Sequence, residues 1–211
     1  RSAGLLLHLS SLPGEFGIGN MGKPSHELID FLSEAGFGHW QICPVGPTSF
    51  GDSPYQSFSS FAGNPYFLDW NPLLDIGLVD EDDLATLQDL PSDSVAYGDL
   101  YERFWIVARK AALRFESRRQ ELESIYGSYE EFIAEKSSWI DSYALFCALK
   151  AENEKKPWWL WPEDLRTFEK ARHRLTDPEL AEELNLHYFL QYLFFSQWKA
   201  LRSYASSRKI S

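Results

Sequence analysis

The chain has 211 residues, of which 44% are hydrophobic and 16% aromatic, and its formal net charge is −11 at neutral pH. This length and apolar content are sufficient for a buried core. The acidic balance argues against binding to nucleic acids or anionic membranes, because phosphate groups are bound by clustered Lys and Arg. No run approaches the ~20 apolar residues that a transmembrane helix requires, and no signal peptide is visible.

The N-terminal part of the chain alternates between strand and helix patterns. Gly4–Leu9 is a short apolar run bounded by Ser and Pro, which predicts a buried strand. Helical spacing follows over residues 27–35 and stops at Gly36, and His39–Val45 predicts a second strand. A strand, a helix and a strand in this order predict two parallel neighbouring strands and an α/β fold.

Three glycines before this helix, Gly17, Gly19 and Gly22, spell GxGxxG. A dinucleotide-binding fingerprint needs the first glycine close to the strand and an acidic residue at the end of the next strand. Here several residues intervene, and no acid follows in the second strand. The glycines therefore predict a tight turn into the helix.

The segment from Gly46 to Trp70 combines aromatic residues with Gly, Ser, Pro, Asp and Asn, and it contains no positive charge. A core strand would not contain its three prolines, and a disordered linker would not contain its aromatic rings. We expect an ordered loop that presents rings beside short polar groups. A sugar needs this combination, because its ring has an apolar face and a rim of hydroxyls. The loop begins at the carboxyl end of a predicted strand, where parallel α/β folds place their sites.

Four side chains in or beside this loop are candidates from the residues alone. Tyr55 and Phe50 are expected to stack on sugar rings, because a loop flanked by Gly and Pro has little core for them to join. Asp52 either caps a turn before Ser-Pro or hydrogen-bonds a sugar or the catalytic groups. His8, near the end of the first strand, either donates to a sugar hydroxyl or is a satisfied core residue.

The remaining chain is helical in pattern. Helical periodicity covers Tyr97–Glu116, Tyr129–Glu152 and Leu180–Arg208, and the acidic run that opens Asp80–Gln88 is typical of a helix N-terminus. These helices predict a mainly α-helical insertion over about residues 80–174. Two strands do not make a stable parallel sheet, so we expect the N-terminal part of a larger α/β protein.

The tryptophans of the segment KPWWLWPEDLR, Trp158, Trp159 and Trp161, have two interpretations. They either form a second sugar platform or pack the insertion onto the rest of the fold, and packing is the expected role.

No Ser/His/Asp or Cys/His arrangement, no carboxylate pair at the strand ends and no metal-ligand spacing of histidines can be recognised. Cys43 and Cys147 lie far apart among apolar residues. We expect them to be buried, reduced thiols of a cytoplasmic protein.

Five segments together resemble the 4-α-glucanotransferases called amylomaltase or disproportionating enzyme. They are LLLHLSSLPG, FGIGNMG, WQICPVGPTSFGDSPYQSFSSFAGNPYFLD, KPWWLWPEDLR and FLQYLFFSQWKALRSYA. The resemblance implies a (β/α)8 TIM barrel with an inserted helical subdomain, incomplete in this chain. Residues 1–79 would supply the first barrel strands and the donor-site loop, 80–174 the helical insertion, and 175–211 a long helix returning to the barrel.

The same resemblance implies transfer of α-1,4-glucan segments between maltooligosaccharides by a retaining double displacement, without metal or organic cofactor. The three catalytic carboxylates of the family lie later in its chain, so no residue of Arg1–Ser211 is expected to be catalytic. Tyr55 maps onto a tyrosine that stacks beside the sugar next to the cleaved bond, and Ser53 onto the adjacent serine. Gln56 is expected to reach sugar hydroxyls, and Phe50 stands where many members have Tyr. The alternative function is a non-catalytic α-glucan-binding module.

Overall fold

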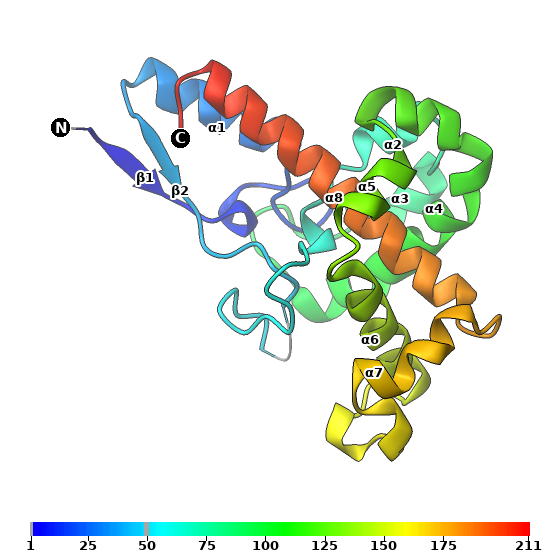
Figure 1. Cartoon of the computed structure of the whole chain (residues 1–211). Helices are drawn as coiled ribbons and strands as arrows, with labels where there is room; N and C mark the ends of the chain where they lie inside the picture. The colour runs from blue at the N-terminus through cyan, green and yellow to red at the C-terminus, as the bar shows by residue number, and fades with distance from the viewer. Residues whose placement is uncertain (1, 49–50) are drawn as a thin grey trace. The chain divides into compact units, whose positions relative to one another are not determined.

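A computed structural model describes residues 2–48 and 51–211, and within them the chain is mostly helical with two strands. The strands are β1 (Gly4–Leu6) and β2 (His39–Gln41). The helices are α1 (Lys23–Glu34), α2 (Asn71–Asp75), α3 (Glu81–Gln88), α4 (Tyr97–Tyr126), α5 (Tyr129–Glu135), α6 (Ile140–Glu152), α7 (Phe168–Ala171) and α8 (Ala181–Ser207) (Figure 1). Short 3-10 turns are η1 (Leu9–Ser11), η2 (Pro65–Phe67), η3 (Trp158–Leu160), η4 (Glu163–Leu165) and η5 (Arg172–Thr176).

The chain divides into two compact units. Unit 1 comprises Arg1–Gly127 and Leu193–Ser211, and unit 2 comprises Ser128–Tyr192. The division passes through α8, whose residues belong partly to each unit. The predicted division into barrel strands (residues 1–79), helical insertion (80–174) and returning helix (175–211) stays a prediction.

In unit 1, β1 and β2 pair in parallel with Leu5 opposite Trp40, and α1 connects them (Figure 1). The predicted strand, helix and strand are thereby confirmed. The helix ends where expected, because Gly36 adopts a φ of +76° that favours glycine. Gly22 is its N-cap, so the glycine-rich stretch leads into the helix as a turn.

The prediction of a buried first strand over Gly4–Leu9 is wrong in two respects. The strand ends at Leu6 and the chain turns into η1, and the Leu6 side chain is exposed. Parallel strands are buried when other elements cover both of their faces. The described residues of unit 1 leave one face of β1 and β2 open, so alternate side chains remain exposed.

The second edge of β2 is occupied by the end of the chain. The Trp40 N–H donates to the Ser211 carbonyl at 3.0 Å, and the Ser211 N–H donates to the Gly38 carbonyl at 3.1 Å. These two bonds lie on either side of His39, which is the hydrogen-bond pattern of a parallel neighbouring strand. Figure 1 shows the C-terminus returning from α8 to this position beside β2.

Helix α3 begins as its sequence predicts. The Asp80 side chain accepts from the Asp83 N–H, and the Asp83 side chain accepts from the Asp80 N–H, which together form a capping box. Asp83 is almost fully buried and also accepts from Lys110 at 2.7 Å and from Arg114, both on α4.

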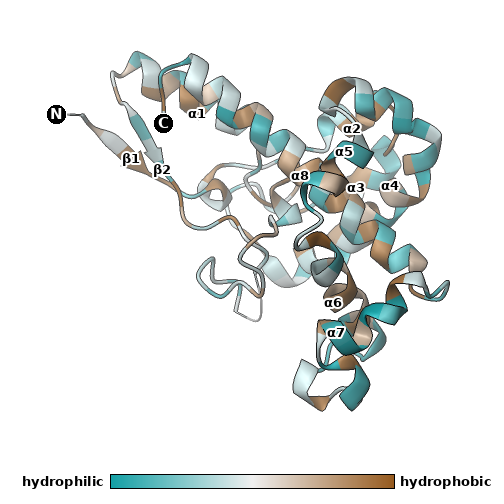
Figure 2. Ribbon diagram, viewed as in Figure 1, coloured by the Kyte–Doolittle hydropathy of each residue, from teal (hydrophilic) through white to brown (hydrophobic). Residues whose placement is uncertain are grey.

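In unit 2, the single helix predicted over Tyr129–Glu152 is two helices, α5 and α6. The chain turns at Lys136–Trp139, where the Trp139 N–H donates to the Lys136 carbonyl at 3.1 Å. Two consecutive serines at this turn have low helix propensity, because their hydroxyls compete for backbone hydrogen bonds. Figure 2 shows that α6 is more hydrophobic than the largely polar α4, and α6 supplies much of the unit 2 core.

Candidate functional site

The segment Gly46–Trp70 leaves the carboxyl end of β2 as an ordered loop in its described residues. Thr48 and Ser57 form an isolated antiparallel bridge across it. Serine hydroxyls form its turns: Ser53 Oγ accepts from the Tyr55 N–H at 3.3 Å, and Ser59 Oγ accepts from the Ala62 N–H at 3.1 Å. The many hydroxyls of this segment therefore fix its backbone as well as lining its surface.

The far end of the loop is anchored against the body of unit 1. The Asn64 N–H donates to the Val45 carbonyl at 2.8 Å, and its side chain accepts from the Tyr66 N–H. At Gly63 a Cβ atom would lie about 2.0 Å from the Phe194 ring, so no larger residue fits there without displacement. The loop is thus positioned at both of its ends.

Among the described rings of the loop, Tyr55 is the most exposed, at 75% of its full surface. Its hydroxyl donates to the Sγ of Cys43, 3.8 Å away, just after β2. This bond to the thiol raises the pKa of Tyr55 above its usual value, so the phenol is neutral at physiological pH. The aromatic ring is therefore held near the carboxyl end of β2 with much of its surface open.

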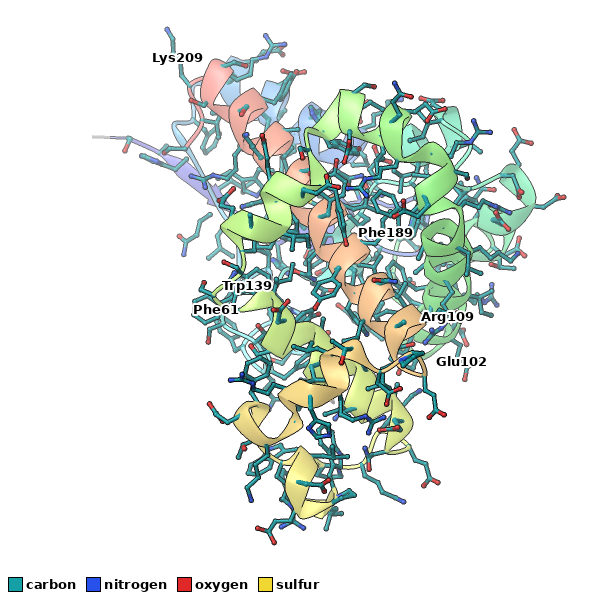
Figure 3. All side chains as sticks on the ribbon, turned by 45° about the vertical axis from the view of Figure 1, so that its right-hand side comes forward. Phe61, Glu102, Arg109, Trp139, Phe189 and Lys209 are labelled. Atoms are coloured by element: carbon teal, nitrogen blue, oxygen red, sulfur yellow. The ribbon has the colours of Figure 1, made fainter. Side chains whose placement is uncertain are left out.

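The other loop residues differ in their surroundings. Ser53 is half-buried and Gln56 is exposed, and the Gln56 N–H donates to the Ser53 carbonyl at 3.0 Å, which places the two side by side in one turn. Phe50 lies outside the described residues. Phe61, labelled in Figure 3, is a further exposed ring of the same loop.

Asp52 and His8 lie at one small cavity. The cavity has a volume of about 20 Å³, about that needed for one water molecule. Its other lining residues come from η1, the glycine-rich stretch before α1, the segment after β2, the loop and the first residue of α4: Ser10, Ile18, Pro44, Gly46, Thr48, Pro54, Asn64, Phe67 and Tyr97.

Asp52 fits both of its interpretations. It has a φ of +55°, a conformation that Asp tolerates better than most residues, so it belongs to a tight turn. It also lines the cavity, where its carboxylate is half-buried.

His8 packs edge-on against Phe67, with ring centroids 5.3 Å apart and planes at 87°. Burial lowers the pKa of His8, so its imidazole is neutral at physiological pH. Its Nδ1 atom is buried and forms no hydrogen bond with the described residues. The ring thus combines the packing of a core residue with a polar atom that has no partner in this part of the chain.

Tyr97 and Ser10 are cavity residues that the sequence did not suggest. Burial raises the pKa of Tyr97, and the neighbouring Ser10 side chain partly offsets this effect. Ser10 follows β1 closely, and this position near a strand end could have identified it as a candidate site residue. Tyr97 lies far from the loop in sequence, and no spacing or motif connects it to the site.

The two cysteines are free and each is partly buried. Within residues 2–48 and 51–211, no group of three or more His, Cys, Asp or Glu side chains is placed to hold a metal ion. Over the same residues, no helix has both the length and the apolar content needed to cross a membrane.

Comparison with known proteins places this geometry in a family. A family model described as 4-alpha-glucanotransferase matches residues 7–211. The 4-alpha-glucanotransferase of Clostridium butyricum is 42% identical over 205 residues, which cover 97% of this chain and 41% of that protein. The Thermus thermophilus enzyme of the same name is 42% identical over 207 residues, covering 98% and 40%.

Comparison with solved structures identifies the same kind of protein. Amylomaltase from Streptococcus agalactiae in complex with acarbose superposes with a TM-score of 0.87 at 34% identity, covering 100% of this chain and 42% of that one. Amylomaltase from Corynebacterium glutamicum, at 16% identity and a TM-score of 0.70, shares the fold. The chain spans about two fifths of the length of the curated relatives and matches their N-terminal portion. It belongs to the 4-alpha-glucanotransferase family.

Proposed function

We propose that this chain is the N-terminal portion of an enzyme that transfers α-1,4-glucan segments between maltooligosaccharides, and that it supplies substrate-binding groups. The observation that carries the proposal is the placement of Tyr55, an exposed ring tethered through its hydroxyl to Cys43 at the carboxyl end of β2. Family membership and the names of the relatives support the activity.

In this proposal a glucose unit stacks its apolar face on Tyr55. Ser53 and Gln56, in the same turn, lie beside it, with Asp52 and His8 at the neighbouring cavity, and the sugar-stacking role of Phe50 stays a prediction from the sequence. Because the His8 imidazole is neutral and its buried Nδ1 has no partner among the described residues, it is suited to hydrogen-bond a water molecule in this cavity that in turn reaches a sugar hydroxyl. These groups bind and orient the sugar.

The chemical steps are assigned to carboxylates outside this chain. In a retaining double displacement one carboxylate forms a glycosyl intermediate, and a second acts first as acid and then as base. Residues of this chain would hold the donor sugar so that its anomeric carbon faces the nucleophile, a contribution of positioning. No metal or organic cofactor is required by this scheme.

The proposal also assigns this chain to the first part of a (β/α)8 barrel. The two backbone bonds that join Ser211 to Gly38 and Trp40 are those of a third parallel strand on the edge of β2. A barrel requires neighbouring parallel strands in sequence order that are joined by helices. The helical insertion over residues 80–174 and a cytoplasmic location belong to the same proposal.

The test is the disproportionation of maltotriose by the full-length protein and its variants. We expect Tyr55→Ala to lower kcat/KM about fivefold to thirtyfold, since stacking is worth about 1–2 kcal/mol. Tyr55→Phe keeps the ring and loses only the bond to Cys43, so its loss should be smaller.

The matched control is Phe61→Ala, which removes an exposed ring of the same loop that has no hydroxyl to tether it to Cys43. Unchanged maltotriose turnover in Tyr55→Ala would refute the assignment of Tyr55. Glucan binding by the full-length protein without any turnover would instead favour a non-catalytic glucan-binding module.

A further inference from the structure

The three tryptophans of Lys156–Arg166, all in unit 2, have different environments. Trp161 is buried, donates its Nε1–H to the Lys156 carbonyl at 2.9 Å and packs on Phe146 within the unit, while the predicted packing of the insertion onto the rest of the fold stays a prediction. Trp158 and Trp159 are 48% and 58% exposed. Packing within the unit therefore does not account for these two rings.

The exposed apolar surface of unit 2 is concentrated around these rings. Among the described residues of the unit, every large hydrophobic side chain that is exposed lies between residues 158 and 168: Trp158, Trp159, Leu160 and Phe168. The indole rings of Trp158 and Trp159 stand at 85° to each other with centroids 5.8 Å apart. They thus present two flat surfaces in different orientations.

A pocket of about 290 Å³ lies at this surface. Trp158, Trp161 and Phe168 form apolar walls, and Ser142, Arg166 and Thr167 bring polar groups to it. The size is near the lower end of the ~300–1,000 Å³ typical of small-ligand sites. The pocket is larger than the cavity beside His8.

The polar groups of the pocket are suited to hydroxyls. Arg166 donates its Nε–H to the Trp161 carbonyl at 2.8 Å, which fixes the guanidinium and leaves its terminal nitrogens to donate to a ligand. Thr167 is the N-cap of α7 but does not cap the helix through its side chain, so its hydroxyl is available. No carboxylate lines the pocket among the described residues.

We infer that Trp158, Trp159 and this pocket form a second α-glucan-binding surface, separate in sequence from the loop around Tyr55. Flat indole rings bind the apolar faces of sugar units, and the hydroxyl and guanidinium donors pair with their rims. The inference rests on the proposed function, since a protein that acts on α-glucans meets long chains of such units. A second surface raises the effective concentration of a long glucan at the first site, and it has no such effect on a short one.

The experiment is affinity electrophoresis of the full-length protein through gels containing amylopectin, which gives a dissociation constant from the mobility. We expect Trp158→Ala and Trp159→Ala each to raise this constant about threefold to tenfold. Trp158→Tyr keeps a flat ring and should retain most of the affinity, whereas Trp158→Leu should not. The control is Leu113→Ala, which removes an exposed apolar side chain from α4.

Two results would overturn the inference: amylopectin affinity in Trp158→Ala equal to that of the Leu113→Ala control, or equal affinity in Trp158→Leu and Trp158→Tyr. The second would indicate docking of an apolar peptide. If the first result came with lower thermal stability of the Trp variants, the rings would be assigned to packing. Maltotriose turnover, measured on the same wild-type sample, tests the proposed function separately.

Discussion

Among single residues, Asp83 has the most strongly perturbed environment of the acidic groups described here. Burial favours its protonated form, but hydrogen bonds from Lys110 and Arg114 outweigh this effect and lower the pKa of Asp83 to about 2. A carboxyl whose pKa is lower in the folded than in the unfolded state stabilises the fold above the unfolded pKa. Asp83 therefore joins α3 to α4 in its ionised form.

We expect Asp83→Asn to lower the free energy of unfolding by about 3 kcal/mol at pH 7, because Lys110 and Arg114 lose their buried partner. Since the pKa of Asp83 falls from 3.8 to about 2 on folding, its contribution is complete above about pH 4 and is lost as the pH falls toward 2. Urea denaturation from pH 7 to pH 2 should show the difference between wild type and variant shrinking by about 2 kcal/mol.

The control is Glu27→Gln, which breaks the exposed pair with Lys23 and should cost less than about 0.5 kcal/mol. A difference between wild type and Asp83→Asn that stays constant down to pH 2 would refute the electrostatic role of Asp83.

At the scale of single residues, part of the candidate site could be predicted from the sequence. The composition of Gly46–Trp70 indicated an ordered loop with rings and hydroxyls, whereas the meeting of His8 and Asp52 at one cavity is a finding of the structure. Tyr97 was not predictable, because it joins the cavity through tertiary folding of α4. The same holds for Cys43, whose bond to Tyr55 depends on how the loop folds back over β2.

Among the elements, α8 fixes the end of the loop through Gln197. The buried amide of Gln197 accepts from the Asp69 N–H and donates to the Asp69 carbonyl, each at 2.8 Å, and also donates to the Tyr126 hydroxyl. Both backbone groups of Asp69 are thereby satisfied by one side chain.

Removing this side chain should destabilise the chain. We expect Gln197→Ala to cost about 1–3 kcal/mol, because it leaves the polar groups of Asp69 without partners. Thermal unfolding followed by circular dichroism measures the effect against Lys199→Ala, an exposed residue of the same helix. Equal melting temperatures for the two variants would show that Gln197 does not hold the loop end.

The elements differ in how well the sequence predicted them. Helix α8 and the start of α3 were predicted closely, because periodicity and capping act within the element itself. The break between α5 and α6 was missed, because apolar residues on both sides continued the helical spacing. The exposure of β1 was missed because burial of a strand depends on neighbours that its own residues do not specify.

For the whole molecule, the family assignment rests on a match over residues 7–211, while the chain covers about two fifths of its curated relatives. The proposed function therefore has two parts: we propose that this chain binds and orients a glucan and that carboxylates elsewhere in the protein perform the transfer. We therefore expect the chain by itself to bind glucan without transferring it.

The most direct measurement is titration of the folded 211-residue chain with maltoheptaose, followed by tryptophan fluorescence, with glucose release from maltotriose assayed on the same sample. We expect saturable binding of maltoheptaose, weakened in Tyr55→Ala, and no glucose release. Glucose release by this chain, or a folded chain that binds no glucan, would contradict it.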